Sequence, residues 1–84
     1  MSLYDLLNCG YIIRIEDNRE SAVGGFYDPA EYWMKDGKLL AWCPEVGILE
    51  CTCSREEMLD NFDSFLSDGL DIIIKHKNEF IRRT

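Results

Sequence analysis

The sequence predicts one α+β domain spanning residues 1–84, in which a small antiparallel β-meander of three or four strands packs against one or two C-terminal helices. Three observations lead to this prediction. The chain has 84 residues, a length that suits a single domain. Its first 53 positions hold short apolar runs separated by turn residues, which indicate strands. Apolar residues at helical spacing begin soon after position 54.

A short helix is predicted near the N-terminus, over residues 2–8. Ser2 is a suitable N-cap, and Asp5 follows three residues later, as in a capping box. Gly10 is expected to end this element, because glycine interrupts helical patterns.

Residues 11–16 alternate in the manner of a β-strand. One face would carry Tyr11, Ile13 and Ile15, and the other Ile12, Arg14 and Glu16. Residues 17–30 contain turn-forming residues and few aliphatic ones, so we expect a long loop, a kind of segment that is often functional.

The segment after this loop fits either a helix or a β-hairpin. For a helix, Asp28 and Pro29 would be the N-cap and the first helical residue. For a hairpin, Asp36 and Gly37 would form a type I′ turn between two strands. We favour the hairpin because tyrosine and tryptophan suit strands, and we keep both alternatives for residues 31–36.

A further strand is predicted over residues 48–53, with Leu49, Cys51 and Cys53 on its inner face. The cysteines of the chain lie in apolar surroundings, where a free cysteine behaves as a small buried hydrophobe. We therefore expect reduced, structural thiols. A zinc site is the competing interpretation, but the spacing lacks the second close pair that such sites use, so we predict no metal and no cofactor. The four cysteines are Cys9, Cys43, Cys51 and Cys53.

The clearest helix is predicted to follow Ser54. Ser54 and Glu57 have capping-box spacing, and Gly69 suits the position just past the C-terminus of the helix. We expect Phe62 and Phe65 to be core anchors. The whole apolar stripe consists of Met58, Leu59, Phe62, Phe65 and Leu66.

Residues 70–82 support two interpretations. Apolar residues at helical spacing favour a second C-terminal helix. The run Ile72-Ile73-Ile74 is β-branched and would suit a strand equally well. We favour the helix.

The charge balance is acidic, with 16 Asp and Glu residues against 9 Lys and Arg, for a net charge of −7. This balance opposes direct binding to nucleic acid or to an anionic membrane, since both depend on basic side chains. No apolar run approaches the ~20 residues that span a bilayer, and no secretory signal is visible. We expect a cytoplasmic protein.

No catalytic constellation is recognisable in the sequence. His76 is the only histidine and lies between two lysines, where a solvated side chain is the simpler interpretation. Nucleophilic catalysis would need a nucleophile beside an oriented base. The P-loop, dinucleotide and nucleophile-elbow motifs are absent. We expect a protein that is not an enzyme.

The second predicted helix carries an acidic face. Glu56, Asp60 and Asp63 recur at steps of four and three, which places them opposite the apolar stripe. One interpretation is a solvated face that serves only solubility. The other is a site for a basic protein partner, in which carboxylates roughly 5–6 Å apart imitate the charge spacing of a nucleic-acid backbone. The candidate partner-binding residues are Glu56, Glu57, Asp60, Asp63 and Asp68, with Phe26 and Tyr27 of the long loop as aromatic anchors.

In size and charge the chain is similar to the small acidic inhibitors that phages and other mobile elements carry, anti-CRISPR proteins included, although no motif points to one family. We therefore expect a protein-binding module that inhibits or regulates a nucleic-acid-handling protein. The alternative is a small structural or assembly domain, with a homodimer as one form, in which the charge serves only solubility.

Overall fold

The computed structural model describes residues 2–17 and 28–76. Two helices and one five-stranded antiparallel sheet make up this part of the chain, which confirms the predicted α+β class with more strands than expected. The strand order is β4-β3-β2-β1-β5. In chain order the elements are α1 (Leu3–Asn8), β1 (Ile12–Glu16), β2 (Ala30–Lys35), β3 (Lys38–Cys43), β4 (Gly47–Glu50), α2 (Arg55–Ser67) and β5 (Asp71–Lys75).

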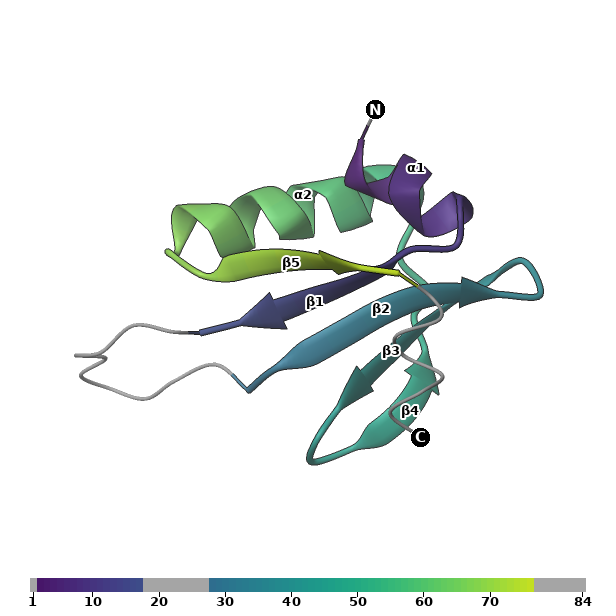
Figure 1. Cartoon of the computed structure of the whole chain (residues 1–84), viewed down its shortest axis with the longest axis horizontal. Helices are drawn as coiled ribbons and strands as arrows, with labels where there is room; N and C mark the ends of the chain where they lie inside the picture. Colours follow the sequence, from purple (N-terminus) through teal and green to yellow (C-terminus); the bar gives the residue numbers. More distant parts are fainter. Residues whose placement is uncertain (1, 18–27, 77–84) are drawn as a thin grey trace.

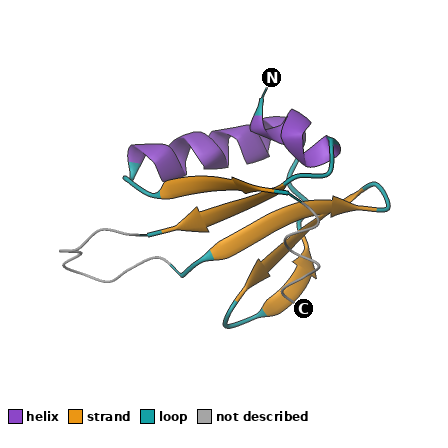
Figure 2. Ribbon diagram, viewed as in Figure 1, coloured by secondary structure: helices purple, strands orange, loops and turns teal. Residues whose placement is uncertain are grey.

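Both helices lie on the same face of the sheet (Figures 1 and 2). Helix α1 packs on β1 and β2, while α2 packs beside α1 and on β5. The β3–β4 end of the sheet therefore receives less cover from the helices. Among the described residues, the sheet thus has a helix-covered face and a helix-free face, and neither described helix has the length and apolar character that crossing a membrane requires.

Helix α1 forms where its capping pattern predicts. The Ser2 hydroxyl accepts a hydrogen bond from the Asp5 N–H at 3.2 Å, and the Asp5 carboxylate accepts one from the Ser2 N–H at 3.0 Å. Hydrogen bonds to the Asp5 carboxylate from the backbone and the side chain of Ser2 lower the pKa of this carboxyl. Leu7 is fully buried on the inner side of this helix, so the short element is held by packing as well as by its cap.

The hairpin between β2 and β3 is confirmed, and the helical alternative for residues 31–36 is wrong. Asp36 and Gly37 have φ values of 52° and 77°, the positive values that a type I′ turn requires at both central positions. Lys35 and Lys38 pair across the turn, and the register continues to Glu31 opposite Trp42.

The favoured helix over residues 70–82 is wrong for its first part, which forms strand β5. Ile73 pairs with Arg14, and Ile74 with Ile13, in an antiparallel ladder along the whole of β1. The β-branched run decides the conformation because β1 offers it a complete row of hydrogen-bonding partners. Residues 77–82 lie outside the described part of the chain.

The core lies between the helices and the helix-covered face of the sheet. Phe62 of α2 is 1% exposed and meets Tyr32 of β2 edge to face, with ring centroids 5.8 Å apart. Phe65 is half-buried against this core, whereas Leu66, placed in the predicted stripe, is 55% exposed. The other buried core residues are Leu7, Ile13, Ile15, Leu39, Met58 and Leu70.

Candidate partner-binding site

The acidic face belongs to α2, and its capping residues fix how the helix begins. The Ser54 hydroxyl accepts a hydrogen bond from the Glu57 N–H at 3.2 Å, and the Glu57 carboxylate accepts one from the Ser54 N–H at 3.0 Å. Hydrogen bonds to the Glu57 carboxylate from the backbone and the side chain of Ser54 lower the pKa of this carboxyl. Glu57, a predicted contact residue, is therefore occupied as a helix cap.

Three other predicted acids face solvent together. Glu56, Asp60 and Asp63 are all exposed, and a 3.6-residue turn places them opposite buried Met58 and Phe62. None of the three acids forms an ion pair within residues 2–17 and 28–76. The structure thus brings these three carboxylates onto one open side of α2.

Asp68 stands apart from that row. It is the C-cap of α2, and its N–H donates to the Ser64 carbonyl at 2.9 Å. It is exposed, at the end of the helix where the macrodipole makes a negative charge less favourable. Asp68 therefore caps the end of the helix and does not belong to the row of Glu56, Asp60 and Asp63.

One basic residue, Arg55, lies at the N-terminal end of α2, next to the acidic face. Arg55 Nη2 lies 3.8 Å from Asp5 Oδ1 and 3.4 Å from Ser2 Oγ, so its charge is turned toward the first turn of α1. The central row of α2 therefore keeps its full negative charge. Phe26 and Tyr27, the predicted aromatic anchors, lie outside the described residues.

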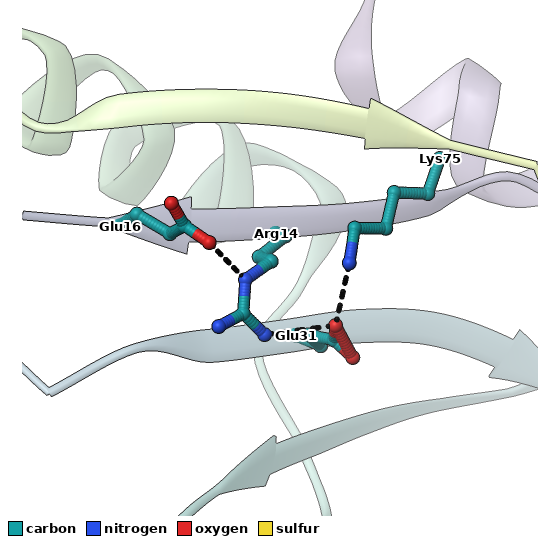
Figure 3. A network of polar contacts seen from close by, with 4 residues as sticks. All are labelled: Arg14, Glu16, Glu31 and Lys75. Carbon is teal, nitrogen blue, oxygen red and sulfur yellow. Dashed lines mark hydrogen bonds and ion pairs between the residues drawn. The ribbon is translucent and has the colours of Figure 1, made fainter. Parts of the chain in front are cut away.

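The sequence interpretation missed a polar network on the helix-free face (Figure 3). Glu31 is only 4% exposed, and its Oε1 lies 3.0 Å from Arg14 Nη1 and 3.4 Å from Lys75 Nζ. Arg14 also bonds Glu16 through its Nε. Burial opposes the charge on Arg14, but the hydrogen bonds to Glu16 and Glu31 outweigh it and raise the pKa of Arg14. The sequence did contain a signal for this network. Arg14 is the one cation within the isoleucine-rich β1, and a buried cation needs a partner.

The thiols differ in their surroundings, and the expectation that all four are buried is wrong for Cys9. Cys9 is exposed at the end of α1, whereas Cys43, Cys51 and Cys53 are half-buried. All four are free. A hydrogen bond with Cys51, together with burial, raises the pKa of the Cys53 thiol, which also accepts a long contact of 3.9 Å from Asn61 Nδ2. The raised pKa is typical of a structural thiol and not of a nucleophile.

No cluster of three His, Cys, Asp or Glu side chains within the described ranges is placed to hold a metal ion. His76 is exposed, and its ring meets Tyr11 edge to face at 5.7 Å. Compared with known proteins, the chain matches no protein-family model, no curated protein and no solved structure.

Proposed function

We propose that this protein is a non-enzymatic binding module whose α2 carries the contact surface for a basic protein partner. The observation that carries the proposal is the exposed row of Glu56, Asp60 and Asp63 on one side of α2. The partner class we propose is a nucleic-acid-handling protein, because such proteins present basic grooves that a row of carboxylates can occupy.

The rigidity of α2 supports this proposal. A capping box fixes its first turn, and Phe62 anchors its opposite side in the core. The three carboxylates are therefore held about one helical turn apart without ordering a flexible segment on binding. Like charges at this spacing cost a few tenths of a kcal/mol of helix stability. Basic side chains of a partner would neutralise the three carboxylates and relieve this repulsion on binding.

The alternative is a small assembly domain in which the acids serve solubility alone. Charge reversal separates the two proposals. Replacing Glu56, Asp60 and Asp63 with lysine should leave the fold intact, because exposed substitutions usually change stability by no more than ~0.5 kcal/mol each. Asp28→Lys is a control for Asp60→Lys, since both acids are exposed and each exchange changes the net charge by the same amount.

The experiment compares proteins that wild-type and triple-lysine forms retain from a lysate of the source cells, with and without an excess of a double-stranded DNA oligonucleotide. We expect the wild type to retain a basic protein that the triple variant and the DNA each release. Wild-type binding should also weaken as salt rises, because screening acts over about 8–10 Å near physiological salt. A folded triple variant that retains the same protein as tightly as wild type would show that α2 is only a solvated face.

A further inference from the structure

Strand β4 is an edge of the sheet, and the backbone N–H and C=O groups of alternate residues point away from the sheet. The Cys51 N–H donates to the Leu39 carbonyl of β3 at 2.8 Å. Because successive N–H groups of a strand point in opposite directions, Leu49 also bonds toward β3. The N–H and C=O groups of Ile48 and Glu50 therefore point away from the sheet, and no described strand lies beyond them.

The side chains at this edge are apolar and exposed. Val46, Ile48 and Leu49 are 64%, 60% and 44% exposed, which makes this the longest run of exposed aliphatic residues in the described part of the chain. Edge strands are normally protected by charges, prolines or bulges. At β4 the charged residues Glu45 and Glu50 stand only near its ends, and the aliphatic side chains between them are exposed.

A pocket of 310 Å³ opens on the helix-covered face beside β4. It exists because the helices cover β1, β2 and β5 and leave the β3–β4 end less covered. Gly47 lies at its rim, and nothing lies within 4 Å of the place where a side chain would begin there. The pocket volume is at the small end of the roughly 300–1,000 Å³ range of ligand pockets, and it suits one or two aliphatic side chains. Its lining includes Tyr32, Ala41, Leu49, Cys51, Cys53 and Met58.

We propose that β4 binds an extended segment of a basic protein, which adds a sixth strand to the sheet. The outward groups of Ile48 and Glu50 would bond its backbone, as in other cases of strand addition. Alternate side chains of the added strand would point toward the helix-covered face, where an aliphatic one enters the pocket beside Gly47. The remaining side chains would face Ile48 and Glu50, where long basic side chains pack their stems and place their charges in solvent.

Charge complementarity identifies this occupant. Glu45 is exposed just before β4, and Glu50 is exposed at its end, where it also pairs with Lys38 at 3.5 Å. Glu57 lies close enough to Cys53 of the pocket to raise the pKa of its thiol. A second copy of the chain would bring another net charge of −7 to the same edge. A basic strand meets these acids, and a second copy repels them. This site is distinct from the row of acids on α2, and either proposal can fail alone.

The probe is a synthetic heptapeptide with lysine at alternate positions, valine between them and leucine at the centre. Binding is followed by amide chemical shifts of the labelled protein. We expect the largest shifts at residues 46–50 and in the pocket lining. Three control peptides carry glutamate in place of lysine, alanine in place of the leucine, or N-methyl groups on alternate amides. Each should bind at least tenfold more weakly, because charge, pocket filling and backbone pairing are removed in turn.

Protein variants give the matching test. Ile48→Pro removes an outward N–H and the exposed Ile48 side chain but no hydrogen bond to β3, so the sheet should persist while peptide affinity falls at least tenfold. Ala41→Leu fills the pocket and should remove the preference for leucine over alanine in the peptide. Leu49→Ala should weaken binding, whereas Ile74→Ala should leave it unchanged, since Ile74 is similarly exposed on the opposite edge at 48%.

Two outcomes would overturn the proposal. Shifts confined to positions 56, 60 and 63 would show that the peptide binds only the acidic side of α2. Shifts at residues 46–50 that grow with protein concentration, and with salt, when no peptide is present would show that the occupant is a second copy. Failure of the triple-lysine test on α2 leaves the β4 site standing, because its readout is the shift pattern at the edge strand.

Discussion

Glu31 lies directly opposite Arg14 on neighbouring strands, and its Oε1 accepts a hydrogen bond from Arg14 Nη1 at 3.0 Å. Lys75 on the next strand reaches the same oxygen at 3.4 Å. One nearly buried carboxylate thus links β2, β1 and β5 across the helix-free face, with each cation only 16% exposed. This face of the sheet thus carries a network of ion pairs, whereas the other face packs against the helices.

Glu31→Gln should therefore lower the free energy of unfolding by about 3 kcal/mol, the lower end for removing one partner of a buried ion pair. The amide removes this carboxylate from Lys75 and leaves Arg14 paired with Glu16, and the remaining exposure of both cations limits the loss. Urea denaturation measures the change. Glu50→Gln is the control, because its ion pair with Lys38 at 3.5 Å is exposed and should contribute less than about 1 kcal/mol. Equal losses in the two variants would contradict this account of the network.

Phe62→Ala should cost roughly 3–5 kcal/mol, enough to unfold much of so small a domain. The ring is 1% exposed and packs against Tyr32, so its removal leaves a cavity between α2 and the sheet. Leu66→Ala on the same helix should cost far less, since Leu66 is 55% exposed. Thermal melts of the two variants give the comparison, and a stable Phe62 variant would show that α2 does not anchor the core.

The capping box of α2 should make the stability of the fold depend on pH in the acid range. The pKa of Glu57 is lowered below its ordinary value of 4.5 in the folded state. Its contribution is therefore complete above pH 4.5 and is lost as the pH falls through the lower folded value. Glu57→Gln keeps an acceptor for the Ser54 N–H but does not titrate, so its melting temperature should fall less between neutral pH and acid. Glu56→Gln, which lies outside the capping box, should retain the pH dependence of the wild type.

Thiol labelling should distinguish the cysteines. At pH 8, iodoacetamide should modify exposed Cys9 well before Cys53, whose raised pKa leaves little thiolate. Peptide mapping by mass spectrometry gives the individual rates. The difference should vanish in urea, where both thiols are equally accessible. Faster labelling of Cys53 in the folded protein would indicate an activated thiol in the pocket.

Local signals account for the parts of the fold that the sequence predicts well. The caps at Ser2 and Ser54 and the turn at Asp36 and Gly37 each act over a few residues, and all three form as expected. The row on α2 follows from the same helical spacing. Such signals need no knowledge of what lies across the fold.

The misjudged elements depend on partners far away in the chain. Strand β5 becomes a strand because β1 pairs with it, and helical spacing in the segment could not reveal that partner. The buried state of Glu31 depends on the register that sets it against Arg14. The pocket beside Gly47 arises because the helices stop short of β4, a result of packing that no motif encodes.

The place of β1 in the sheet also has a consequence for biosynthesis. The residue of β5 that pairs with Ile13 is Ile74, which lies 61 residues later in the chain (74 − 13), so one side of β1 has no native neighbour until that segment has been synthesised. Pairings so distant in sequence raise the contact order and slow the search for the native state. In that interval the nascent chain presents an isoleucine-rich edge, the kind of surface that chaperones cover and that aggregates when they do not. Truncation before Asp71 would make that transient state permanent, and fragments of this length should accumulate as insoluble protein.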